Sequence, residues 1–159
     1  MKLEAVFDES GSYRYLLSRV WNPTLPKLLY VMLNPSTADK TTEDQTSRQC
    51  IYFAKKFGFG SFEVVNLYSL ISTNPKGLRT SSIDPIGNDN DLYITEAAAR
   101  ADLIIVAWGT DHFFNKRNEI IRNKLKADGY KLFCLKKTKY GHPGHPSRLK
   151  HDIDQLIEF

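Results

Sequence analysis

The sequence has no long hydrophobic run and none of the short signatures that identify many enzyme families. No stretch of about 18 consecutive apolar residues occurs, so the sequence predicts no transmembrane helix. The N-terminal segment MKLEAVFDES lacks the apolar core of a signal peptide, which makes the cytoplasm the expected location. Walker A, GxGxxG and GxSxG motifs are missing, which excludes the common phosphate-binding loops and the nucleophile elbow of hydrolases.

Cysteine is scarce, and basic residues exceed acidic ones only modestly. Cys50 and Cys134 lie in separate apolar stretches, so we expect both thiols to be buried and unpaired, as in a reducing compartment. The net charge of +4 permits an anionic partner without requiring one. Basic residues gather near the C-terminus, where either a solvated face or such a partner explains them: Lys131, Lys136, Lys137, Lys139, Arg148 and Lys150.

Apolar runs alternate with helical periodicities along the chain. Strands are expected at 3–7, 13–20, 28–33, 62–67, 103–108 and 131–135. Four helices are expected: one that begins at the capping-box pair Thr42 and Gln45, one that Asn88 caps, one over 114–129, and a last one that Ser147 caps and that shows Leu149, Ile153 and Leu156 on one face.

This alternation predicts an α/β fold. We expect a three-layer α/β/α sandwich with a central, mainly parallel four-stranded sheet and an N-terminal β-hairpin. No linker or repeat divides the sequence, so residues 1–159 are expected to form a single domain. Because ligands of such folds bind beyond the carboxyl ends of the strands, polar residues that follow those strands are candidates for a common site.

Two asparagines and a histidine occur at such positions. Asn34 follows the run 28–33, where its amide forms either an Asx turn or a contact with a water or a base edge. Asn66 interrupts an apolar strand, and a buried amide must bond either to a neighbouring loop or to a ligand. His145 lies in GHPGHPS, where it could donate a hydrogen bond to developing negative charge.

Other polar residues permit weaker hypotheses. His142 and His145 raise the possibility of a metal site, but the nearest further ligands have no zinc-like spacing, so we expect neither metal nor cofactor. Asp39 and Asp44 flank the loop after the first buried run. Each carboxylate either orients a water molecule or places negative charge at a helix N-terminus.

The chain resembles the DUF1643 family, which has no assigned activity, in six segments: LNPSTAD, RQCIYFAKKFGFG, VVNLYSL, DPIGNDND, VAWG and TKYGHPGHPSRL. A more distant resemblance is to uracil-DNA glycosylases, through Asn34-Pro35, Val64-Val65-Asn66, Ala107-Trp108-Gly109 and His145-Pro146-Ser147. It implies that Asn34 positions the hydrolytic water, that Asn66 reads the base edge and that His145 stabilises the departing base. The chain departs from that pattern at Met32-Leu33, where the glycosylases carry a glycine before the motif.

The second resemblance implies further substrate-binding residues and a function. Ser36, Tyr68, Lys139 and Arg148 are expected to contribute to substrate binding, with DNA or a nucleotide as the partner. The predicted activity is hydrolysis of an N-glycosidic bond to a base in DNA or in a nucleotide. The alternatives are a non-catalytic nucleic-acid or nucleotide binder on the same scaffold, and a metal-dependent enzyme that uses the two terminal histidines.

Overall fold

The computed structural model describes residues 1–36, 38, 41, 43–72, 78, 82–111 and 116–159. They form one seven-stranded mixed sheet with strand order β1-β2-β4-β3-β5-β6-β7. The strands are β1 (Lys2–Phe7), β2 (Arg14–Val20), β3 (Lys27–Met32), β4 (Ser61–Asn66), β5 (Leu103–Val106), β6 (Leu132–Cys134) and β7 (Ile157–Glu158). Strands β4, β3, β5 and β6 are parallel, which confirms the predicted parallel core.

The sheet is wider than the four strands predicted from the sequence. The N-terminal hairpin is present, but β2 pairs antiparallel with β4, so the hairpin extends the central sheet and does not stand apart from it. At the other edge β7 pairs antiparallel with β6. Periodicity identifies a strand but not its partner across the sheet, which is why the hairpin and the short last strand were not placed.

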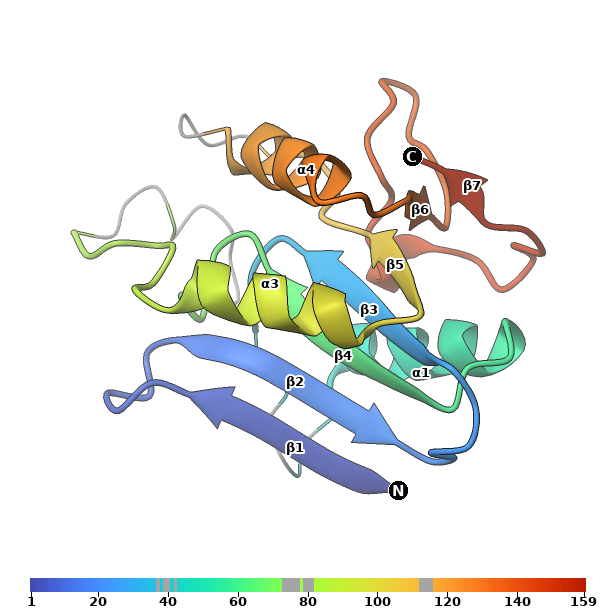
Figure 1. Cartoon of the computed structure of the whole chain (residues 1–159), viewed down its shortest axis with the longest axis horizontal. Helices are drawn as coiled ribbons and strands as arrows, with labels where there is room; N and C mark the ends of the chain where they lie inside the picture. The colour runs from blue at the N-terminus through green and yellow to red at the C-terminus, as the bar shows by residue number, and fades with distance from the viewer. Residues whose placement is uncertain (37, 39–40, 42, 73–77, 79–81, 112–115) are drawn as a thin grey trace.

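Helices cover both faces of the sheet (Figure 1). Helices α3 (Asn90–Arg100) and α4 (Arg117–Ala127) pack on one face, and α1 (Gln45–Lys56) packs on the other. The central strand β3 is buried on both sides: Leu29 and Val31 contact the α3 and α4 side, whereas Leu28 and Tyr30 contact the α1 side. None of the helices within the described ranges is long and apolar enough to cross a membrane.

Two helix starts differ from the prediction. Asp44 is the N-cap of α1: its carboxylate accepts the Ser47 N–H at 2.8 Å, and the Ser47 hydroxyl oxygen accepts the Asp44 N–H at 2.9 Å. The predicted first residue, Thr42, lies outside the described residues. Helix α3 begins after Asp89 and not after Asn88. Both sites offer several residues able to cap, and the sequence alone does not choose among them.

The predicted last helix is wrong. A 3₁₀ turn, η1 (Pro146–Arg148), is present, but Leu149 is already extended, with φ −95° and ψ 143°. The apolar residues of the following segment pack on the α1 side of the sheet, and His151 stacks on Tyr52 at 3.6 Å between ring centroids. The chain then pairs as β7. Packing and strand pairing therefore replace the helical hydrogen bonds that the periodicity had predicted.

The two cysteines are free and buried, as predicted. Cys50 lies in α1 and Cys134 in β6, each within a hydrophobic cluster. Burial raises the pKa of both thiols. They are therefore core residues with little thiolate character.

Candidate functional site

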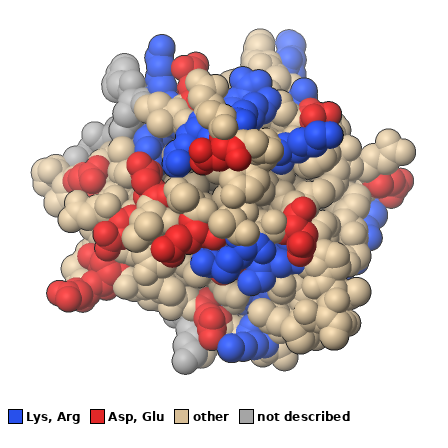
Figure 2. Space-filling view, in the orientation of Figure 1, with Lys and Arg blue, Asp and Glu red and all other residues tan. Residues whose placement is uncertain are grey.

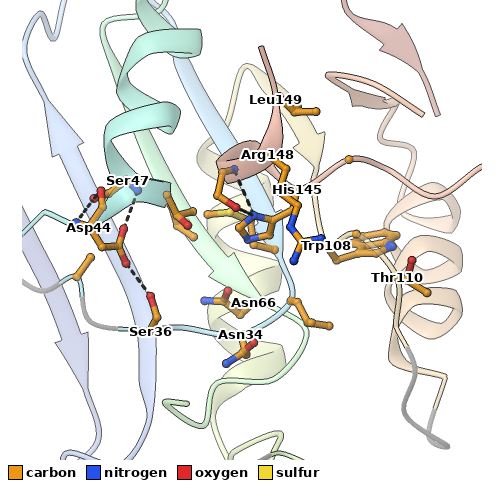
Figure 3. Close-up of a pocket in the computed structure, with 18 of the residues that line it drawn as sticks. Asn34, Ser36, Asp44, Ser47, Asn66, Trp108, Thr110, His145, Arg148 and Leu149 are labelled. Carbon is orange, nitrogen blue, oxygen red and sulfur yellow. Dashed lines mark hydrogen bonds between the residues drawn. The ribbon is translucent and has the colours of Figure 1, made fainter. Parts of the chain in front are cut away.

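A cavity of about 770 Å³ opens at the carboxyl ends of the parallel strands. The chain leaves β3 toward β4 on one side, and later runs from β5 to β6 on the other. Loops that diverge in this way leave a crevice between them, where ligands of open α/β sheets bind. The wall comes from β2, the end of β4, the N-terminus of α1, and the segments after β3, β5 and β6 (Figure 3).

Six of the seven predicted site residues line this cavity: Asn34, Ser36, Asn66, Lys139, His145 and Arg148. Tyr68 does not line it. The Tyr68 hydroxyl donates to both carboxylate oxygens of Asp111 at 3.1 Å, and its ring packs in the cluster on the α3 and α4 side. Burial and the nearby Asp111 charge raise the pKa of Tyr68. The sheet therefore brings together residues far apart in the sequence, but it places Tyr68 in the core.

Asn66 forms part of the cavity wall and is 1% exposed. Among the described residues, neither its Nδ2 nor its Oδ1 has a hydrogen-bond partner. An unbonded buried amide costs on the order of 1–3 kcal/mol, a cost that a hydrogen bond to a water or a ligand in the cavity would remove. The amide offers such a partner one donor beside one acceptor.

The end of β4 is held from behind by the segment DPIGNDND. The Asn90 amide nitrogen donates to the carbonyl oxygens of Asn66 and Leu67, at 2.8 and 3.2 Å. Arg117 Nε donates to the same Leu67 carbonyl at 3.2 Å. These contacts position the Asn66 backbone and use none of its side-chain atoms.

Asn34 has a partly structural role. Its Nδ2 donates to the carbonyl oxygens of Ser72 at 2.7 Å and Pro35 at 3.2 Å, and the Ser72 N–H donates back to the Pro35 carbonyl at 3.0 Å. The segment after β3 is thereby tied to the segment after β4. With the nitrogen occupied, the Oδ1 atom remains to accept a hydrogen bond.

His145 has a defined orientation. Ser147 N–H donates to its Nδ1 at 3.3 Å, and the Ser147 hydroxyl lies 2.7 Å from the same nitrogen. Because Nδ1 accepts, the neutral ring carries its proton on Nε2 and donates from that atom. Burial and the charge of Arg148 lower the pKa of His145, although Asp44 acts against them. The site therefore holds a neutral hydrogen-bond donor.

The opposite wall carries Asp44, for which the sequence left two roles open: orienting a water molecule, or placing negative charge at a helix N-terminus. Besides capping α1, Asp44 accepts a hydrogen bond from the Ser36 hydroxyl at 2.6 Å. Burial alone would raise the pKa of Asp44, but the hydrogen bonds from Ser36 and Ser47 and the charge of Arg14 lower it. Asp44 is therefore ionised at neutral pH, inside the cavity.

Arg14 was missed by the sequence reasoning. It lines the cavity, is 5% exposed, and donates from Nη1 to the Ala38 carbonyl at 2.7 Å. The signal was available, because Arg14 and Arg19 are charged residues within a mostly apolar strand. A buried charge of this kind needs compensation, and the charge of Arg14 acts on the Asp44 carboxylate, whose pKa it lowers.

Several cations also line the cavity: Arg14, Lys136, Lys137, Lys139 and Arg148. All but Arg14 belong to the segment after β6, as the clustering of basic residues near the C-terminus suggested. Side chains of this charge are suited to phosphate groups.

The metal hypothesis gains no support from side-chain placement. The Nδ1 atom of His145 is engaged with Ser147. Across the described part of the chain, no group of three or more histidine, cysteine or carboxylate side chains is arranged to hold a metal ion.

A family profile described as "Protein of unknown function (DUF1643)" matches residues 14–147. The chain belongs to the DUF1643 family. No curated protein and no solved structure matches it. The DUF1643 segment begins at Arg14 and ends at Ser147, both of which line the cavity, so the family pattern spans almost the whole site.

Proposed function

We propose that this DUF1643 protein binds a nucleobase in the cavity and hydrolyses its N-glycosidic bond, on a scaffold like that of uracil-DNA glycosylases. The observation that carries the proposal is Asn66, a buried amide whose donor and acceptor both lack a partner in the part of the chain that the structure describes. Every nucleobase presents a donor next to an acceptor on its Watson–Crick edge, which is the complement of one side-chain amide. The substrate is a base in DNA or in a nucleotide.

The leaving base is stabilised by His145. As the bond between C1′ of the sugar and the base nitrogen breaks, the electron pair moves to the base, and its negative charge faces the Nε2–H of the neutral imidazole. A preorganised donor of this kind typically contributes about a hundredfold in rate. The hydrogen bonds from Ser147 to Nδ1 hold the ring in the required tautomer.

The attacking water is oriented by Asn34 Oδ1 and gives its proton to Asp44. Asn34 cannot accept that proton itself, because an amide is not a base at neutral pH. Asp44 is ionised and lines the same cavity. Water oxygen adds to C1′, one proton passes to the carboxylate, and the released base later takes up a proton.

A second candidate is a binding protein without turnover. It is favoured by Asn34, whose amide nitrogen is fixed by two backbone carbonyls, so that the motif after β3 supplies no base of its own. This candidate keeps Asn66 as the residue that recognises the base.

An activity screen with parallel binding measurements separates the two candidates. Oligonucleotides and nucleotides that carry uracil, hypoxanthine or other modified bases are assayed for base release and for affinity. We expect His145→Ala and Asp44→Asn to lower the release rate by about a hundredfold, and Asn66→Leu to lower the affinity for the base by about tenfold or more. Binding without release by the parent protein supports the second candidate, and unchanged binding in Asn66→Leu contradicts both.

A further inference from the structure

The segment after β6 folds into a short hairpin at the rim of the cavity. Lys137 pairs with Pro143 in an antiparallel bridge, and Gly144 N–H donates to the Lys136 carbonyl at 2.7 Å. The turn is closed by the Gly141 N–H, which donates to the Thr138 carbonyl at 2.9 Å. The hairpin is therefore held by its own backbone, and its tip, Lys139 and Tyr140, is presented in a defined place.

Tyr140 at this tip is 80% exposed, the largest exposed fraction among the exposed large hydrophobic side chains of the described residues. Its ring contacts the Lys139 ammonium, with Nζ 5.6 Å from the ring centroid. Neither hydrophobic cluster of the fold includes it. An aromatic ring held away from the core beside a cation is suited to stacking on another planar group.

The hairpin that carries Tyr140 also carries cations that line the cavity. Lys136, Lys139 and Arg148 line the cavity rim, and Tyr140 directly follows Lys139. Figure 2 shows basic side chains at the top of the visible face, interspersed with acidic ones, at the end where α4 and the C-terminal loops lie in Figure 1; further basic side chains lie at the centre and lower edge of the face. Tyr140 therefore follows a cavity-lining cation in the sequence but is not itself part of the lining.

We propose that the hairpin 136–144 is a binding platform for single-stranded nucleic acid, in which Tyr140 stacks on the base next to the one held in the cavity. This inference rests on the proposed base-binding function and specifies its substrate as a strand and not a free nucleotide. A mononucleotide seated at Asn66 has no second base to offer Tyr140. A duplex keeps its bases stacked on one another, whereas an exposed aromatic ring needs an unpaired base.

Fluorescence anisotropy on the full chain tests the platform with labelled oligothymidylate, labelled oligouridylate and a labelled duplex. We expect Tyr140→Ala to weaken binding of both single strands by roughly fivefold or more, and Tyr140→Phe to remain within about twofold of the parent. Ile120→Ala, at an exposed position on α4, is the control for the loss of a surface apolar side chain. Thermal unfolding checks that each variant is folded.

The cation contribution is measured on the same oligomers. Lys139→Ala combined with Arg148→Ala is expected to weaken binding of DNA and RNA strands alike and to flatten the dependence of affinity on salt. Lys131→Ala, at an exposed position before the opposite end of β6, is the control for the loss of a surface positive charge and should bind as the parent does.

Different results contradict the proposed platform and the proposed base-binding cavity. Three results would overturn the platform: the parent binds no single strand, the parent prefers the duplex, or the parent binds the single strands no more tightly than Tyr140→Ala does. A mononucleotide titrated into Asn66→Leu tests the cavity by itself, and Tyr140→Ala should bind that mononucleotide as the parent does. Loss of strand binding in Tyr140→Ala with no effect of Asn66→Leu on either ligand would leave the platform and remove the cavity function.

Discussion

The carboxyl end of β4 and the start of α3 each contain a buried asparagine, and the two side chains are used differently. Asn90, in the first turn of α3, is 0% exposed and gives its amide nitrogen to two backbone carbonyls of the β4 end. Asn66, at 1% exposed, has no side-chain hydrogen bond to any residue of the described ranges. Over the same ranges, Asn90 leaves only its Oδ1 unbonded, whereas Asn66 leaves both amide atoms unbonded.

This difference separates a residue that supports the fold from one that is available to a ligand. The start of α3 is reinforced further by Arg117, which bonds the Leu67 carbonyl and pairs with Asp91 at 2.6 Å. Burial alone is therefore a poor guide to the role of an asparagine. The partners of its amide group distinguish the two cases.

The largest effect on stability is expected from Asn90→Leu. The change removes two hydrogen bonds and leaves the Asn66 carbonyl without this donor, so the free energy of unfolding should fall by about 2–3 kcal/mol. For a chain of this size the melting temperature should fall by roughly 5–10 °C. Differential scanning calorimetry measures it. A melting temperature within a degree of the parent would show that the contact at α3 is dispensable.

Asn66→Leu should behave in the opposite way. Leucine has the same number of side-chain heavy atoms and the same branch point as asparagine, and it removes an unbonded polar group, so the melting temperature should equal or exceed that of the parent. Affinity for a nucleobase ligand should fall by about tenfold or more, because the pair of hydrogen bonds is lost. Calorimetric titration and thermal unfolding are measured on the same preparation. A large loss of stability would instead identify Asn66 as a structural residue.

A smaller effect concerns pH and tests whether the cavity holds a neutral histidine. Burial and the charge of Arg148 lower the pKa of His145 below its ordinary value of 6.5. As the pH falls, His145 of the unfolded chain is therefore protonated at a higher pH than His145 of the folded protein. The contribution of this group to stability is complete above the unfolded pKa and is lost as the pH falls through the folded pKa. The parent should therefore lose more stability between pH 7 and about pH 5 than His145→Gln does. Equal losses would mean that His145 titrates normally.

The smallest effect is on the reactivity of the two thiols, Cys50 and Cys134, which reports how often the folded core opens to solvent. Both thiols are buried, so Ellman's reagent should react slowly with the native parent and rapidly after denaturation. Asn90→Leu should label faster in native buffer because the unfolded population rises, and Asn66→Leu should label no faster than the parent. Rapid labelling of the native parent would contradict the core position of both cysteines.

The sequence by itself determined the parallel core and the type of every helix and strand in it, but not the C-terminal segment. Continuous apolar runs marked β3, β4 and β5 because these strands are buried on both faces, and periodicity marked α1, α3 and α4. The convergence of Asn34, Asn66 and His145 on one cavity was also predictable. Each follows or ends a parallel strand, and such strands have their carboxyl ends at the same edge of the sheet.

Tertiary structure alone decided the pairing partners and the uses of the polar side chains. The hairpin joined the main sheet, and the segment after Arg148 became extended because contacts with α1 and β6 outweighed its helical periodicity. Tyr68 turned into the core toward Asp111, and Asp44 proved to be both a helix cap and a cavity wall. A hydrogen bond depends on which groups the folded chain brings within about 3 Å, and a local sequence pattern does not encode that distance.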